Sequence, residues 1–285
     1  MALIKFSDSS KPLAELARNL KEVSTCGGRA ALIDSTWVTP LAVVPVCAMA
    51  RSLEVIIDFA DESNSADVRS YLKAVEFPNG TSEVAFSYRR SYLPLTRLDL
   101  PGSNVTLNQV VSEYVSLILA KSENSNRSDL RSAISHALGE MTTNVQEHAR
   151  AKRYWLFAQY WPQKSALEFC IVDDGIGIRQ RYSEEGMVFN NDKEALAAAI
   201  QGRSVKQPLS DLPGDRGYGL GSTIRLLTGA ELGGSFLIIS GDTGYVKRHN
   251  NTAQIFRFSA GWQGVMVGAK LRFPKQNLDI LKYMQ

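Results

Sequence analysis

The stretch GEMTTNVQEHA (residues 139–149) places three polar side chains of different chemistry at equal spacing. Glu140, Asn144 and His148 are four residues apart, so on a helix they lie within an arc of about 80° on one face. A carboxylate there can accept a proton from water or a hydroxyl, and an amide oxygen one turn on can bind Mg²⁺. Apolar residues on the other side of this helix predict that it packs against a core, so the polar stripe faces either water or a cavity.

A second block, VDDGIG (residues 172–177), follows directly on the apolar run LEFCIV, which is typical of a buried strand. It places an acid, Asp173 or Asp174, before Gly175 and Gly177. An acid at a strand end can accept a hydrogen bond from a ligand such as an adenine amino group, and the glycines let the backbone approach the ring. An ordinary aspartate–glycine turn explains the same residues without a ligand.

A third block, DRGYGLGS (residues 215–222), opens a predicted helix with Gly217, Gly219 and Gly221. Glycines at this place leave backbone N–H groups and the positive helix end directed at an anion, such as a phosphate. The block lacks the lysine of a Walker A loop and does not follow the first strand of a Rossmann unit, which disfavours a dinucleotide. A fourth block, GWQGVMVGAKLRF (residues 261–273), predicts a closing strand.

The composition is typical of a folded globular protein and does not indicate a nucleic-acid or membrane partner. The 285 residues, 44% of them hydrophobic and 21% charged, suffice for one large or two medium domains. A net charge of +3 with scattered basic residues predicts no nucleic-acid partner. The longest apolar window, residues 41–50, is too short for a bilayer, and the N-terminus has no signal-peptide pattern. The three cysteines form no CxxC, as in reducing compartments, so we expect a cytoplasmic protein.

The predicted elements divide the chain into two parts. ALID, a helix from Pro40, LEVIIDF and the helix DVRSYLKAVEF alternate as strand, helix, strand, helix, which indicates an α/β unit. The apolar strand LEVIIDF is expected to be buried on both faces of a sheet. We place the boundary near residue 100, give or take about ten residues, with domains 1–100 and 101–285.

Two segments of the first part are irregular. Pro45, inside the helix that begins at Pro40, predicts a kink or a delayed start. The tyrosines, arginines and prolines of residues 83–100 predict an extended linker or an edge strand followed by a crossing.

The second part predicts helices followed by an antiparallel sheet. Residues 106–122 and 128–148 have the pattern of two helices, the second capped by Ser128. YWLFAQYW and ALEFCIVDD are predicted antiparallel strands joined at residues 162–165, and SFLIISGDTGYV, AQIFRFSA and GVMVGAKLRF complete the sheet. We expect helices on one face of a largely antiparallel sheet, a fold of the mixed α/β (α+β) class.

Taken together and in this order, the blocks resemble the GHKL superfamily of ATP-binding domains, which includes gyrase-type topoisomerases, heat-shock chaperones, histidine kinases and mismatch-repair ATPases. The resemblance covers residues 128–273 and implies a two-layer α/β sandwich that binds ATP and Mg²⁺. It implies that Glu140 is the general base, Asn144 the Mg²⁺ ligand and Asp173 the acceptor of the adenine amine. The other cofactor-binding residues that it implies are His148, Gly175, Gly177, Gly217, Tyr218, Gly219, Leu220, Gly221 and Ser222.

The same resemblance implies a lid and a subfamily. Residues 179–215 would close over the nucleotide, with Lys206 or Arg216 reaching the γ-phosphate. The spacing E-x-x-x-N-x-x-x-H, followed by alanine, is more similar to stand-alone anti-sigma serine kinases than to the chaperones. A sensor histidine kinase is disfavoured, because the only earlier histidine, His136, lies inside the helix that carries the base.

The first part resembles the STAS-like fold of anti-sigma factor antagonists, in which a strand ending in Asp-Ser-Ser starts the helix that is phosphorylated. Here Asp34-Ser35-Thr36 occupies that place and makes Ser35 a candidate phosphosite. Trp37 and Pro40 stand where that family has small residues and glycine. An ordinary turn also explains the Asp-Ser-Thr sequence.

These observations predict a Mg²⁺-dependent protein that hydrolyses ATP and uses its nucleotide state to control the first domain or a protein partner. Two alternatives stay open: a serine/threonine kinase of anti-sigma type, and a non-catalytic ATP-gated interaction module. A regulatory protein partner is expected, and a homodimer is a further option that the resemblance implies. Neither nucleic acid nor a membrane is expected as a partner.

Overall fold

The computed structural model describes residues 2–7, 11–60, 64–82, 90–99, 107–121, 127–202 and 219–273, together with Leu278 and Tyr283. The backbone of residues 142–148 is part of that description and their side chains are not. Within these residues the fold is mixed α/β, with one parallel and one antiparallel sheet.

The first sheet has three parallel strands in the order β1 (Ala2–Ile4), β2 (Arg29–Leu32) and β3 (Ile56–Phe59). Parallel neighbours need a crossover, and helices α1 (Pro12–Thr25) and α2 (Pro40–Ser52) supply the two crossovers. Both helices begin at a proline, where the missing N–H costs nothing. Helix α2 starts at Pro40 without delay and continues through Pro45.

The second sheet has five antiparallel strands in the order β4-β5-β6-β8-β7. Its strands are β4 (Tyr92–Asp99), β5 (Arg153–Trp161), β6 (Ala166–Asp173), β7 (Ser235–Arg248) and β8 (Gln254–Arg272). The edge strand β4 starts this sheet before residue 100. The predicted hairpin between β5 and β6 is confirmed, whereas the two last predicted strands are the single strand β8.

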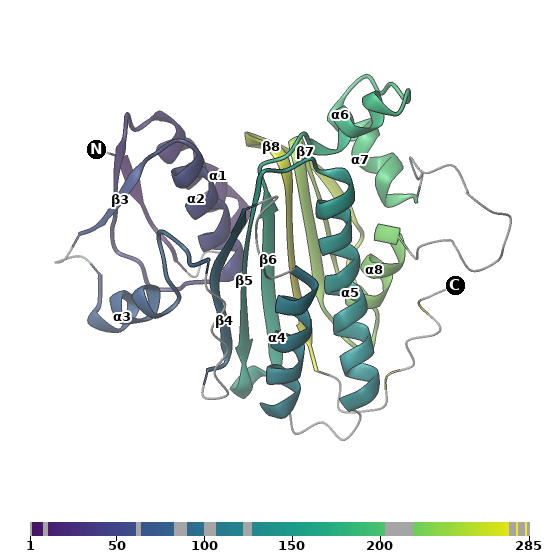
Figure 1. The fold of residues 1–285 in the computed structure, drawn as a ribbon, viewed down its shortest axis with the longest axis horizontal. Coiled ribbons are helices and arrows are strands. Elements are labelled where there is room, and N and C mark those ends of the chain that lie inside the picture. Colours follow the sequence, from purple (N-terminus) through teal and green to yellow (C-terminus); the bar gives the residue numbers. More distant parts are fainter. Residues whose placement is uncertain are drawn as a thin grey trace, which may run out of the picture.

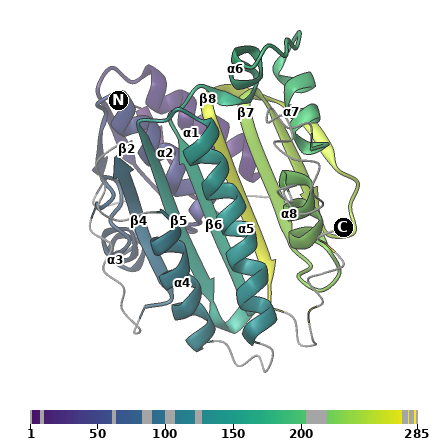
Figure 2. The same cartoon turned by 45° about the vertical axis from the view of Figure 1, so that its right-hand side comes forward.

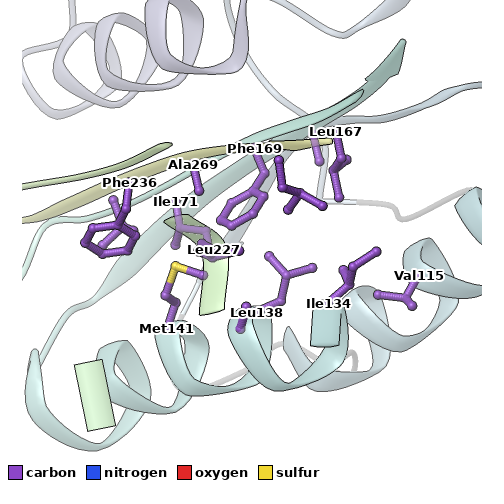
Figure 3. Packing of buried hydrophobic residues seen from close by; sticks show 14 of the residues in the cluster. Val115, Ile134, Leu138, Met141, Leu167, Phe169, Ile171, Leu227, Phe236 and Ala269 are labelled. Carbon is purple, nitrogen blue, oxygen red and sulfur yellow. The ribbon is translucent and has the colours of Figure 1, made fainter. Parts of the chain in front are cut away.

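Helices cover both faces of the five-stranded sheet, as Figures 1 and 2 show. Helices α4 (Leu107–Lys121), α5 (Arg127–His148) and α8 (Gly219–Thr228) lie on one face. On that side Leu138 and Met141 of α5 point at the sheet, towards residues such as Ile171 (Figure 3). The other described helices are α3 (Ala66–Ala74), α6 (Gly177–Glu184), α7 (Asp192–Ile200) and the short 3-10 helix η1 (Pro162–Lys164) between β5 and β6.

The opposite face of the same sheet packs against α1 and α2, so the expectation of helices on one face only is wrong. Trp155, Phe157, Cys170 and Val172 share a core with these two helices. The reason lies in the strands themselves, because β5 and β6 are apolar at almost every position and need cover on both sides. This second core, called the shared core below, joins the two halves of the chain.

Two further expectations differ from the structure. Strand β1 and helix α1 precede Ala30, where the sequence predicts no element. Ile56 of β3 is 55% exposed, so this strand is not buried on both faces of the sheet. Across the described residues, no helix is long and apolar enough to cross a membrane.

Candidate functional site

Asp173 is the last residue of β6 and is 0% exposed. Its Oδ1 accepts a hydrogen bond from Gly175 N at 2.9 Å. Oδ2 is buried and has no hydrogen-bond partner among the described residues. Burial raises the pKa of Asp173 from 3.8 to about 7, against the opposing effect of the backbone N–H groups of Gly175 and Val265. A buried acceptor of this kind needs a donor, and the protein part described here supplies none.

Three glycines bring the backbone close around Asp173. A Cβ at Gly175 would collide with the carbonyl group of Ala149, just beyond the end of α5. A Cβ at Gly264 would collide with Asp173 itself, and one at Gly177, whose φ is +75°, with a carbonyl oxygen of β8. These three positions, called the glycine cradle below, therefore admit no side chain. They join the end of β6 to α5 and β8.

Asp174 has a different role from its neighbour. Its Oδ1 accepts from the backbone N–H groups of Lys152 and Arg153, both at 2.8 Å, and its Oδ2 lies 3.5 Å from Arg153 Nε. The carboxylate thus holds the start of β5 against the end of β6. Of the two acids that the sequence offers, Asp173 is the one with an unused acceptor.

Helix α5 includes all three polar residues of the first block. Glu140 is half-buried and lies one turn after His136. Burial lowers the pKa of His136, and the charge of Glu140 opposes that effect. The side chains of Asn144 and His148 lie outside the described set, so only their place on the helix is given.

The first turn of α8 contains four of the predicted phosphate-binding residues, Gly219, Leu220, Gly221 and Ser222. Ser222 Oγ donates to the carbonyl oxygen of Gly219 at 2.8 Å, and Gly219 has a φ of +55°. Helix α8 packs beside α5 (Figure 2). The structure therefore brings the start of α8 and the polar helix of the first block to the same face of the sheet.

Several predicted residues fall outside the described ranges. They are Gly217, Tyr218, Lys206 and Arg216. The predicted lid, residues 179–215, is described as far as residue 202 and there forms most of α6 and all of α7.

Four partly buried apolar side chains edge the core beneath α5 and α8. They come from four elements and are Ile178, Ile200, Leu220 and Val265. Val265 follows Gly264 of the cradle, and an added Cβ on Gly221 would touch the carbonyl oxygen of Ile200 at 3.0 Å. Among them only Leu220 is indicated by the sequence, although the others lie next to or near a glycine. All four pack against the core that includes Leu138 of α5 and Leu226 of α8.

Two side chains to which the sequence assigned no role, Trp262 and Ser240, also hold the cradle. Trp262 Nε1 donates to the carbonyl oxygen of Asp173 at 2.9 Å. Ser240 Oγ accepts from Ile178 N at 3.0 Å and donates to the carbonyl oxygen of Gly264 at 3.1 Å. Both are buried, at 8% and 4% exposure. Strand pairing alone brings them here, so spacing in the sequence could not reveal them.

Ser35, the candidate phosphosite, is buried at 3% exposure. Its Oγ accepts from Phe6 N at 3.1 Å and donates to the carbonyl oxygen of Ile33 at 3.2 Å, while its backbone N–H donates to Asn64 Oδ1. The hydroxyl is therefore bonded to the main chain as both donor and acceptor. Ser35 and the exposed Thr36 both line a cavity of about 430 Å³.

Comparisons with protein-family models, curated proteins and solved structures found no match. The described residues contain no group of three or more His, Cys, Asp or Glu side chains placed to hold a metal. Mg²⁺ is often held by one or two protein oxygens together with substrate phosphates, and the carboxylate of Glu140 and the amide of Asn144 belong to that class of donor.

Proposed function

We propose that this chain binds ATP at the corner formed by the end of β6, α5 and the start of α8. The observation that carries the proposal is the buried, unpartnered Oδ2 of Asp173. The exocyclic amine of adenine is an N–H donor of the kind that this oxygen lacks. An unpaired buried acceptor costs about 1–3 kcal/mol, so a ligand that supplies the donor is favoured over one that does not.

The surroundings of Asp173 support the same ligand. The glycine cradle places main-chain atoms, and no side chains of its own, against Asp173, and the partly buried apolar residues Ile178 and Val265 directly follow two of its glycines. The start of α8 offers a positive helix end for phosphates. An acceptor for the base and a helix start for the phosphates, both on the same face of one sheet, match the two ends of a nucleotide.

We further propose that the bound ATP is hydrolysed with the help of Mg²⁺, as in GHKL domains. Asn144 would hold the ion together with the phosphates, and the ion neutralises phosphate charge when bound. Glu140 would accept the proton of the attacking water, and a closed lid would keep bulk water out. In this proposal the five-stranded sheet with α4, α5 and α8 is the GHKL-type sandwich, and the parallel sheet is the STAS-like unit of a cytoplasmic regulatory protein.

Titration calorimetry with ATP and ITP tests the base-binding step. ITP carries a carbonyl in place of the amine, so it presents an acceptor to Asp173. We expect ITP to bind at least about tenfold more weakly than ATP, with the difference lost in Asp173→Asn. Equal affinities of wild type for ATP and ITP would refute the assignment of Asp173.

Phosphate release tests the catalytic step. Glu140→Gln should retain ATP binding and lose turnover by about 10²-fold or more. The control is Glu113→Gln on α4, an exposed glutamate outside the site. Full turnover in Glu140→Gln would exclude Glu140 as the base, and label transferred to protein instead of phosphate release would favour the kinase alternative.

A further inference from the structure

Strand β8 holds Asp173 by a side-chain hydrogen bond. The indole N–H of Trp262 donates to the main-chain carbonyl oxygen of Asp173 at 2.9 Å. The regular pairing of β6 with β8 ends one residue earlier, at Val172 and Met266. The indole therefore bonds a carbonyl group that lies just beyond the end of the ladder.

Trp262 is also a member of the shared core. Its side chain is 8% exposed and belongs to the same cluster as Leu20 of α1 and Val44 of α2. Helix α1 packs directly along β8. One side chain thus bonds the main chain of Asp173 and belongs to the same core as α1 and α2.

We propose that Trp262 is the positioning residue that fixes Asp173 for an adenine amine and that passes nucleotide occupancy to α1 and α2. The inference rests on the proposed function, because it needs a ligand at Asp173. In this proposal the hydrogen bond between Trp262 and Asp173 couples the two halves of the chain.

The packing around Asp173 leaves little room for it to move alone. The Cα of Gly264 is so close that a single added carbon would collide with Asp173. When a ligand pulls on the carboxyl group, the peptide of Asp173 and the indole bound to it must shift together, because close-packed interiors transmit small displacements. Coupling is reciprocal, so a partner that repacks α1 or α2 changes ATP affinity by the same factor.

The chain contains a matched control for this hydrogen bond. Trp155 on β5 is 0% exposed and lies in the same shared core. Its Nε1 is buried without a hydrogen-bond partner among the described residues. Trp155→Phe and Trp262→Phe therefore remove the same atoms from one core, and only the second removes a hydrogen bond.

Hydrogen exchange with and without ATP, combined with calorimetry, tests the proposal. We expect ATP to slow exchange in α1 and α2 of wild type and of Trp155→Phe. In Trp262→Phe this response should be absent and ATP affinity should fall about tenfold. If wild type does not bind ATP, the proposed function and this inference both fail. If ATP binds and Trp262→Phe responds as Trp155→Phe does, only this inference fails.

A spectroscopic readout covers the case in which Trp262→Phe does not fold. The four tryptophans are labelled with 5-fluorotryptophan, and the resonance of Trp262 is identified by elimination with Phe variants of the other three. Without nucleotide, this resonance should titrate near pH 7, where burial places the pKa of Asp173, and the titration should vanish in Asp173→Asn. ATP should shift the same resonance. A resonance insensitive to both pH and ATP overturns the role of Trp262.

Discussion

The carboxyl groups of Asp173 and Asp174 are adjacent in the sequence and lie in opposite environments. Asp173 is 0% exposed and keeps one oxygen without a partner, whereas Asp174 binds two backbone N–H groups and Arg153 near the surface. The fold thus gives two identical side chains different tasks. Asp174 joins two strands, whereas Asp173 keeps an acceptor oxygen to which a ligand can donate a hydrogen bond.

Replacing Asp173 by Asn should stabilise the ligand-free protein at pH 8. The pKa of Asp173 is raised from 3.8 to about 7 in the fold, so its contribution to stability is full below pH 3.8 and is lost as pH rises through 7. The neutral amide avoids that loss, worth up to about 4 kcal/mol from the size of the shift. Urea unfolding at pH 8 and at pH 4 measures it, and the gain should disappear at pH 4. Asp174→Asn is the control, with a change of about 1 kcal/mol or less.

Binding of ATP should release a proton below pH 7. An amine donates best to the ionised carboxylate, so ligand binding must remove the proton that Asp173 carries at lower pH, given its pKa of about 7. Apparent affinity should then fall by up to about tenfold for each pH unit below 7. Calorimetry at pH 6 in two buffers of different ionisation enthalpy counts the protons. A heat of binding that is the same in both buffers would contradict the prediction.

Gly264→Ala should destabilise the protein by about 1–3 kcal/mol, because the added carbon collides with Asp173. Gly139→Ala is the matched substitution, since a Cβ there meets nothing within 4 Å and the residue lies inside α5. It should stabilise the protein by about 0.5–1 kcal/mol. Thermal unfolding of the two variants compares them, and equal effects would show that the cradle is not tightly packed.

A fragment that begins at residue 101 should not behave as an independent domain. It lacks β4, α1 and α2, so the face of the sheet that carries Trp155 and Phe157 would meet water. An apolar face of this size favours aggregation, and the full chain should unfold in one transition. Calorimetry of the full chain and gel filtration of the fragment test this. A soluble monomeric fragment with its own sharp transition would show that the halves fold separately.

The elements that could be predicted are those whose pattern is local. The hairpin of β5 and β6 and the helix carrying Glu140 follow from runs of apolar residues within one element. Helix α1 was missed, although Leu16, Leu20 and Val23 repeat at helical spacing on its buried side. Strand β8 was divided in two because Gly261 resembles a turn, whereas it lies inside the long strand with a φ of +66°.

The part of the candidate site that could be predicted consists of residues that lie close together in the sequence and have recognisable chemistry. Asp173 with its glycines belongs to that part. The role of Trp262 does not, since the two atoms of its hydrogen bond lie 89 positions apart and meet through strand pairing. The burial of Ser35 likewise depends on Asn64, which is 29 positions away. Spacing along one sequence contains no information about such partners.

The glycine cradle has a consequence for any compound directed at this corner. Its walls are main-chain atoms of Ala149, Asp173 and β8, and a main-chain surface keeps its shape when side chains elsewhere change. For a small heterocycle that donates a hydrogen bond to Asp173 and lies flat against these walls, few substitutions in the chain would abolish binding. An added carbon at one of these glycines would bring resistance only together with damage to the fold.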